Sequence, residues 1–344
     1  MQKTITPTDA LKLLEQRKYD KNHVPKPQQV FFKIDNKIIG LMQSFVVFSG
    51  LPKNGKSTFI SAAIGSAFHN EDLFKLNLCL PIERNEIALF DTESSEHDFY
   101  KNIDRIKKFA NCNGVLDKRF FAYSLREDEP TQIKAFIEAF LIAHKQCSCV
   151  IIDGLLDLIL DFNSVIEGRQ LINWLKKITK KYNCMLVVVL HLGKKDLNTL
   201  GHLGSMCDRY ANSVLKVEKN KERQTFELSS TLLRSDSDFD TISIAYSDNN
   251  GYNLVDTEPK QKPRNYKDWN EQEHRTLCNK VIKEKGSKYS DLVEDIKEAA
   301  TVGTNISKYI IKHWNDNNII FKRDGLYFYS GLSQEFFLFA LLFP

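Results

Sequence analysis

The amino-acid sequence predicts an α/β fold with a mainly parallel central sheet, plus a small C-terminal domain of helices and a hairpin. Between residues 45 and 191, short apolar runs alternate with longer amphipathic patterns, which is typical of βαβ units. After residue 268 the pattern changes to helical segments followed by two short strands. A polar stretch with two prolines, residues 257–268, separates the two patterns and is the expected linker.

Residues 1–39 are predicted to form an N-terminal extension of one helix and one hairpin. Thr6 and Pro7 precede an amphipathic segment, and proline is favoured at the first helical position. The run VFFKIDNKIIG that follows resembles two strands turning near Asp35 and Asn36.

Residues 40–256 are predicted to form the α/β domain. The expected strands are Phe45–Ser49, Glu86–Asp91, Phe120–Ser124, Cys149–Asp153 and Cys184–His191. The expected helices are Lys56–Phe68, Glu96–Ala110, Thr131–Gln146 and Ile166–Tyr182. Alternating strands joined by polar turns follow in residues 211–255, and we expect these to be antiparallel.

Residues 269–344 are predicted to form a winged-helix-like domain with an apolar tail. The expected helices are Asn270–Lys285, Tyr289–Ala299 and Asn305–Asn315. A hairpin turning on Asp324 and Gly325, a favoured type I′ pair, would supply the wing. Trp314 and Tyr309 are expected in the core, and the tail EFFLFALLFP either caps a core or docks onto a neighbouring subunit.

Composition places the protein among ordinary globular chains. The 344 residues are 42% hydrophobic and carry a formal net charge of +4, which is compatible with a nucleic-acid partner without demonstrating one. The seven scattered cysteines suggest reduced thiols in the cytoplasm. No run of eighteen apolar residues and no signal-peptide core is present, so we expect no membrane span.

The stretch from Gly50 to Ser57 fits the pattern G-x-x-x-x-G-K-[ST], and it stands between an apolar strand and a helix. Such a loop turns its backbone amides inward toward phosphate oxygens, and the following helix adds its positive end. The lysine reaches the terminal phosphates and the serine hydroxyl ligates Mg²⁺. The sequence therefore predicts ATP and Mg²⁺ as cofactors, bound by Gly50, Lys53, Asn54, Gly55, Lys56, Ser57 and Thr58.

Further candidates stand where the neighbouring strands end. Asp153 ends the run CSCVIID and would hold the metal with Ser57, with Asp157 as an alternative. Glu93 would deprotonate the attacking water; Asp91 is its rival, and the same stretch could instead cap a helix. His191 ends the next strand and would sense the γ-phosphate, although a lone histidine often serves only as a structural hydrogen-bonding group.

In their order, the segments IALFDTESS, VIIDGLLDLI, VVVLHLGKK, GHLGS and LLRSDSDFDTISIAY resemble the RecA-like ATPase core of hexameric replicative helicases, both RepA-like and DnaB-like. The resemblance spans roughly residues 40–256. It supports His191 as the sensor and implies that Arg234 is an arginine finger reaching into the adjacent subunit. Leu232 stands where the DnaB-type group has a second basic residue, and His202 and Leu203 stand where the RepA-like group has an arginine.

The resemblance implies a homo-oligomer, such as a hexameric ring, that acts on single-stranded DNA. Loops at the position of Gly193–Gly204 line the central channel in that group. Winged-helix modules place one helix, here Thr304–Trp314, in the DNA groove, with the wing against the backbone. Candidate phosphate contacts, each of which could equally be a solvated surface charge, are Lys194, Lys195, Lys308, Lys312, Lys322 and Arg323.

The leading interpretation is an ATP-hydrolysing DNA motor, helicase-like, for replication, recombination or mobile-element transfer. The alternative is an ATP-gated DNA-binding regulator or loader that oligomerises without unwinding. A small-molecule kinase is a third reading, which the absence of an obvious arginine-rich lid and the presence of an extra DNA-type domain disfavour.

Overall fold

The computed structural model describes residues 5–69, 72–111, 116–192, 201–248, 251–256, 266–283, 285–300 and 302–331. The chain forms two compact units, one ending at residue 259 and the other beginning at residue 260. Most of the predicted linker, Lys194, Lys195 and the apolar tail lie outside the described residues.

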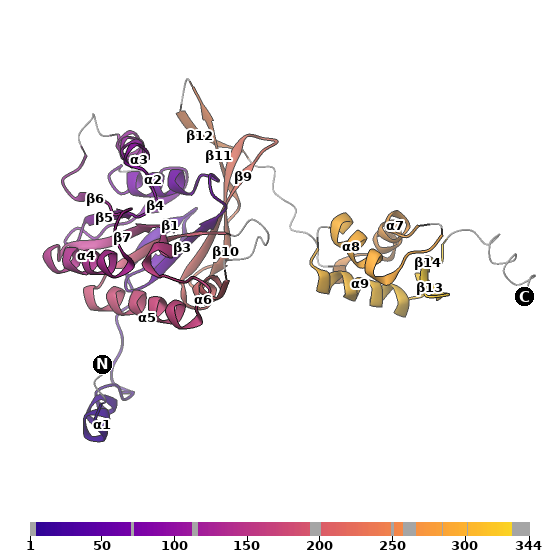
Figure 1. The fold of residues 1–344 in the computed structure, drawn as a ribbon, viewed down its shortest axis with the longest axis horizontal. Coiled ribbons are helices and arrows are strands. Elements are labelled where there is room, and N and C mark those ends of the chain that lie inside the picture. Colours follow the sequence, from indigo (N-terminus) through magenta and orange to yellow (C-terminus); the bar gives the residue numbers. More distant parts are fainter. Residues whose placement is uncertain are drawn as a thin grey trace, which may run out of the picture. The chain divides into compact units, whose positions relative to one another are not determined.

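The first unit contains the predicted alternation of strands and helices (Figure 1). Its helices are α1 (Pro7–Glu15), α2 (Lys56–Ser66), α3 (Glu96–Phe109), α4 (Pro130–Ala143), α5 (Val165–Tyr182) and α6 (Gly201–Tyr210), with a 3₁₀ turn at Leu155–Leu158. Its strands are β1 (Val30–Ile34), β2 (Lys37–Leu41), β3 (Phe45–Gly50), β4 (Leu76–Leu78), β5 (Glu86–Asp91), β6 (Phe120–Ser124), β7 (Cys147–Asp153), β8 (Met185–His191), β9 (Ser213–Asn220), β10 (Thr225–Leu233), β11 (Ile242–Ser247) and β12 (Gly251–Val255).

The main sheet has nine strands in the order β12-β11-β10-β9-β3-β8-β7-β5-β6. The strands from β9 to β6 along this order run parallel, while β10, β11 and β12 are antiparallel to their neighbours. This arrangement confirms the prediction of a mainly parallel sheet continued by antiparallel strands. It also brings the carboxyl ends of β3, β5, β7 and β8 to one edge, where α/β proteins bind ligands.

The central strands of the sheet are buried on both sides because helices cover both of its faces. One core contains side chains of α2, α3 and the small sheet β2-β1-β4, including Phe32, Phe59 and Ile106. The other contains side chains of α4, α5 and α6, including Phe140, Leu175 and Leu203. Two hydrophobic layers thus hold the strand ends in place from above and below.

The N-terminal hairpin is an integral part of the first unit's core, although the sequence pattern suggested an extension. Phe31, Phe32, Ile34 and Ile39 are fully buried in it. The turn falls at Asp35 and Asn36 as expected, since both have the positive φ angles of a type I′ turn. By contrast, α1 begins at Pro7 behind the Thr6 cap and buries none of its residues.

The second unit contains helices and one hairpin around its own core. The helices are α7 (Glu271–Val281), α8 (Tyr289–Ala300) and α9 (Thr304–Asp316), preceded by a 3₁₀ turn at Tyr266–Asp268; the strands are β13 (Ile320–Arg323) and β14 (Leu326–Tyr329). Trp314 lies at the centre and is fully buried. The prediction for Tyr309 is wrong: its side chain is 59% exposed, because it lies on the outer face of α9.

Two elements were not predicted, β4 and α6. The first four residues of α6 fall in the predicted loop Gly193–Gly204, so that loop is shorter than expected. Within the described part of the chain, no helix has the length and apolar character needed to cross a bilayer.

Candidate active site

The loop between β3 and α2 has the backbone geometry that phosphate binding requires. Gly55 has a φ of 91° and precedes the first helical residue, Lys56. A Cβ at Gly55 would stand 2.6 Å from the ring of Phe226, so no larger residue fits. Because α2 begins at this loop, the positive end of the helix favours an anion there.

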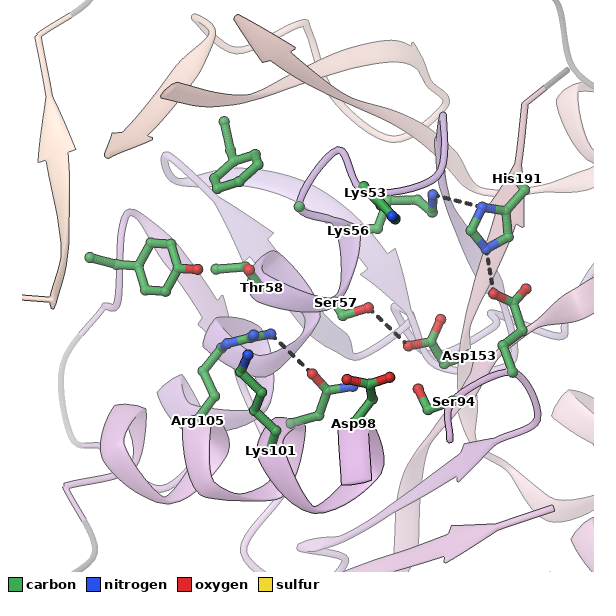
Figure 2. A pocket seen from close by; sticks show the side chains of 15 residues that line it. Lys53, Lys56, Ser57, Thr58, Ser94, Asp98, Lys101, Arg105, Asp153 and His191 are labelled. Atoms are coloured by element: carbon green, nitrogen blue, oxygen red, sulfur yellow. Dashed lines mark hydrogen bonds and ion pairs between the residues drawn. The ribbon is translucent and has the colours of Figure 1, made fainter. Parts of the chain in front are cut away.

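A cavity of about 390 Å³ opens above this loop. Figure 2 shows its lining side chains, which come from the loop itself, α2, α3, the ends of β5, β7 and β8, and the strands β10 and β12. The lining residues are Lys53, Gly55, Lys56, Ser57, Thr58, Glu93, Ser94, Asp98, Lys101, Asn102, Arg105, Asp153, His191, Phe226 and Tyr252. Gly50 and Asn54 belong to the loop but do not line the cavity.

Lys56 is buried at the base of the cavity, with 5% of its surface exposed. Its ammonium lies 2.8 Å from the carbonyl oxygen of Gly50, 2.9 Å from that of Leu51 and 3.0 Å from His191 Nδ1. Burial lowers the pKa of Lys56 to about 8, against the opposing attraction of Asp153 and Glu93. The three N–H groups of the ammonium thus all donate to protein atoms, and they could donate to phosphate oxygens instead.

Ser57 and Asp153 stand together beside Lys56, as the sequence suggested. The Ser57 hydroxyl donates to Asp153 Oδ2 at 3.3 Å. Burial raises the pKa of Asp153 to about 7, and the carboxylates of Asp91 and Glu93 add to the shift. A carboxylate so placed favours a cation, and a hydroxyl with a carboxylate is the hard oxygen pair that Mg²⁺ prefers. These two residues fit a magnesium ion shared with phosphates.

Glu93 and His191 both line the cavity and contact each other, and His191 lies beside Lys56 (Figure 2). His191 Nε2 lies 2.5 Å from Glu93 Oε2, so His191 bridges Lys56 and Glu93. Since Lys56 donates to Nδ1, the imidazole carries its proton on Nε2 and donates it to Glu93. A carboxylate at the cavity rim is placed to accept a proton from water, with the histidine in contact with it.

Asp91 and Asp157, the two alternatives considered for these roles, lie outside the lining. Asp91 is buried, and its Oδ1 accepts the backbone N–H groups of Glu93 at 3.1 Å and Ser94 at 2.8 Å. Asp157 accepts a hydrogen bond from Thr92. Of the four acidic candidates, Glu93 and Asp153 reach the cavity.

Arg234 lies away from the cavity and contacts the end of α6. Its guanidinium donates to the carbonyl oxygens of Ala211 at 2.8 Å and Asp208 at 3.3 Å, and to that of Arg209. It therefore satisfies carbonyls at a helix C-terminus within its own chain.

The four remaining basic candidates with described positions lie in the second unit. Lys308 and Lys312 are on the exposed face of α9, beside Tyr309. Lys322 and Arg323 are exposed on β13 at the hairpin tip, where Lys322 also lies over the ring of Tyr327.

Sequence reasoning missed the contribution of α3 to the cavity. Asp98, Lys101, Asn102 and Arg105 line it from successive turns, and the Arg105 guanidinium donates to Asn102 at 3.1 Å. The available signal was periodicity. These positions recur at the helical spacing of three to four residues on the polar face of a helix that begins just after Glu93.

The part of the chain that contains this site matches one known family model. Residues 33–196 match the family model described as an AAA domain, a P-loop NTPase domain of the RecA-like class. The match includes the loop, Glu93, Asp153 and His191, and it supports ATP binding and hydrolysis. None of the curated proteins matches the chain significantly.

Proposed function

We propose that this protein is an ATP-hydrolysing DNA motor of the helicase-like type that works as a homo-oligomer. The observation that carries the hydrolytic part is the convergence of Lys56, Ser57 with Asp153, and Glu93 with His191 on one cavity. These are the groups needed to hold a triphosphate, share a magnesium ion with it and activate water.

The geometry supports a simple sequence for one turnover. The β- and γ-phosphates take over the donors that Lys56 now gives to Gly50, Leu51 and His191. Ser57 and Asp153 would hold Mg²⁺, and the ion would neutralise phosphate charge there. Glu93 then accepts the proton of the attacking water, and His191 stays close to both the lysine and the base.

Coupling to DNA rests on two features. His191 ends β8 and is followed closely by the segment 193–200, so a change at its imidazole can reach that segment directly. The second unit presents Lys308, Lys312, Lys322 and Arg323 on its surface, and such cations suit contacts with a phosphate backbone. Arg234, proposed as a finger for a neighbouring subunit, would have to leave its carbonyl partners to act in that way.

The test is the rate of ATP hydrolysis with and without single-stranded DNA, with solution mass measured with and without nucleotide. We expect stimulation by DNA, a larger assembly with ATP, and displacement of a labelled strand. Lys56→Ala should abolish all three. A protein that hydrolyses ATP at the same rate with and without DNA, and separates no strands, would contradict the motor.

An ATP-gated DNA-binding regulator or loader is the second candidate, favoured by a separate second unit with exposed cations on α9 and β13. This alternative predicts DNA binding that changes with nucleotide, but no strand separation. Replacing Lys308 and Lys312 together by alanine should weaken binding at all sequences and flatten its salt dependence.

A further inference from the structure

The carboxyl ends of β5 and β7 are joined by a side-chain contact that lies directly behind the proposed hydrolysis site. The Thr92 hydroxyl lies 2.7 Å from Asp157 Oδ2 and 3.1 Å from the carbonyl oxygens of Asp153 and Gly154. A hydroxyl has one proton, and the nearest, charged acceptor is Asp157. Thr92 is itself buried, with 3% of its surface exposed.

This contact involves the residues next to Glu93 and Asp153, two of the acidic groups that line the cavity. Thr92 precedes Glu93, and its backbone N–H donates to the carbonyl oxygen of Asp153 at 3.0 Å. Asp91 holds the amide of Glu93 from the other side at 3.1 Å. The backbone that carries Glu93 is therefore fixed to the strand that carries Asp153.

Gly154 shows how closely these groups pack. It has a φ of 120°, and a Cβ there would collide with the Thr92 hydroxyl and stand 2.8 Å from Glu93 Cγ. The Glu93 side chain thus lies against the backbone of Gly154, with the Thr92–Asp157 pair beneath it. Any change in the pair moves the surface on which Glu93 lies.

We propose that Thr92 and Asp157 are positioning residues for hydrolysis, which set the place of Glu93 relative to Asp153 and the bound phosphates. Neither residue lines the cavity, so they act through Glu93 and make no contact with nucleotide. The inference rests on the proposed hydrolytic function and gives a role to Asp157 other than metal binding.

The experiment compares variants that keep or remove the hydrogen bond. Thr92→Val has nearly the same shape and lacks the hydroxyl, and Asp157→Ala lacks the acceptor. We expect each to lower kcat about 10- to 100-fold, as for a displaced catalytic group, with KM and the Kd for a non-hydrolysable ATP analogue unchanged. Thr92→Ser keeps the hydroxyl donor, and Asp157→Asn keeps an acceptor. The kcat of each of these two variants should stay within about threefold of that of the original protein.

A second comparison separates positioning from general structural damage. In a Glu93→Gln background, Thr92→Val should cause no further loss, because the base that it positions is already absent. An equal loss of kcat on Thr92→Val in the original protein and in the Glu93→Gln background would overturn the inference. So would weaker binding of the ATP analogue by Thr92→Val, or an unchanged kcat in that variant. If the unaltered protein binds ATP yet hydrolyses none, the proposed function itself fails and the positioning role fails with it.

Discussion

Lys56 has its three ammonium donors engaged before any nucleotide arrives. These contacts keep a buried cation satisfied and hold it where a phosphate can replace them. His191 takes part in two contacts at once, so the lysine and the base are linked through a single imidazole. At the residue scale the site is therefore a chain of exchangeable hydrogen bonds.

The first prediction concerns Lys56. Lys56→Ala should weaken binding of an ATP analogue about 10- to 100-fold, because hydrogen bonds to charged groups contribute about 1.5–3 kcal/mol each. Isothermal titration calorimetry measures this Kd directly. The control is Lys118→Ala, an exposed lysine that does not line the cavity, which should change the Kd by less than about fivefold. Equal effects of the two substitutions would contradict the role of the buried lysine.

The second prediction concerns Glu93. Glu93→Gln keeps the size of the side chain and removes its basicity, so kcat for ATP should fall about 10²- to 10⁴-fold while nucleotide binding is retained. Release of phosphate under saturating ATP measures kcat. Glu96→Gln is the control, because it neutralises a nearby exposed acid on α3 that does not line the cavity. Residual hydrolysis close to the original rate would assign the proton transfer elsewhere.

At the scale of elements, the sequence located most of the architecture because apolar runs and turn residues act locally. The strands β3, β5 and β6 begin where predicted, and the turns at Asp35 and Asp324 have the expected positive φ angles. Strand β4 was not predicted because three residues are too few to show a periodic pattern. Helix α6 was not predicted because its glycine-containing start resembles a loop.

The cavity was predictable in part, for a related reason. Its loop, Glu93, Asp153 and His191 stand at the ends of recognisable strands. The α3 face and the Thr92–Asp157 contact depend on which strands become neighbours, and β5 lies beside β7 only in the folded sheet order. The same dependence on tertiary contacts placed Tyr309 outside the core that Trp314 fills.

The third prediction concerns the end of α6. Arg234→Ala leaves carbonyls of that helix end without a donor and should lower the free energy of unfolding by about 1–2 kcal/mol. Urea denaturation monitored by circular dichroism measures this loss. Arg209→Ala removes an exposed arginine from the same helix and should cost less than about 0.5 kcal/mol. An unchanged urea midpoint in Arg234→Ala would show that its contacts are not made in solution.

The fourth prediction concerns pH and the core of the second unit. The Trp314 indole donates to His274 Nδ1 at 3.1 Å, which requires a neutral imidazole. Burial lowers the pKa of His274 below 6.5, and the nearby His313 ring adds to this, against the Tyr266 carbonyl and Glu273. The unfolded chain binds the proton at higher pH than the folded unit does. Stability is therefore full above pH 6.5 and falls as the pH drops toward the folded pKa.

Urea unfolding of the full chain at pH 7.5 and 5.5 tests this shift. Trp269 packs against the core of the second unit and Trp314 lies within it, whereas Trp174 belongs to α5 of the first unit. A Trp174→Phe background therefore makes tryptophan fluorescence report the second unit. His274→Gln retains an acceptor for the indole and does not titrate, so most of the difference between the two pH values should disappear. A pH difference of the same size in His274→Gln would assign it to other groups.

At the scale of the whole molecule, the two units have separate hydrophobic cores and can respond separately to heat and ligand. Only the first unit contains the cavity with the phosphate-binding loop. Ligand binding stabilises the folded state that binds it, by about 2.7 kcal/mol at a ligand concentration of 100 times Kd. The units should therefore be distinguishable by their response to ATP.

The fifth prediction is that calorimetry resolves two unfolding transitions, of which only one moves upward with ATP and Mg²⁺. Lys56→Ala should reduce the upward shift at the same ATP concentration and leave the other transition in place. One transition that moves as a whole with nucleotide would mean that the two units unfold cooperatively.

The central position of β3 has a consequence for how the chain is made. The hydroxyl of Ser49 in this strand donates to the carbonyl oxygen of Leu215, 166 residues away. The ammonium of Lys56 contacts His191, which is 135 residues away. At about 5–20 residues per second, a ribosome needs roughly 10–30 s to supply these partners. During that interval the apolar strand β3 lacks its sheet neighbours β8 and β9 in the nascent chain. We expect ribosome-stalled chains that end before residue 185 to be cut readily by protease near β3, and chains that extend well beyond residue 255 to resist it.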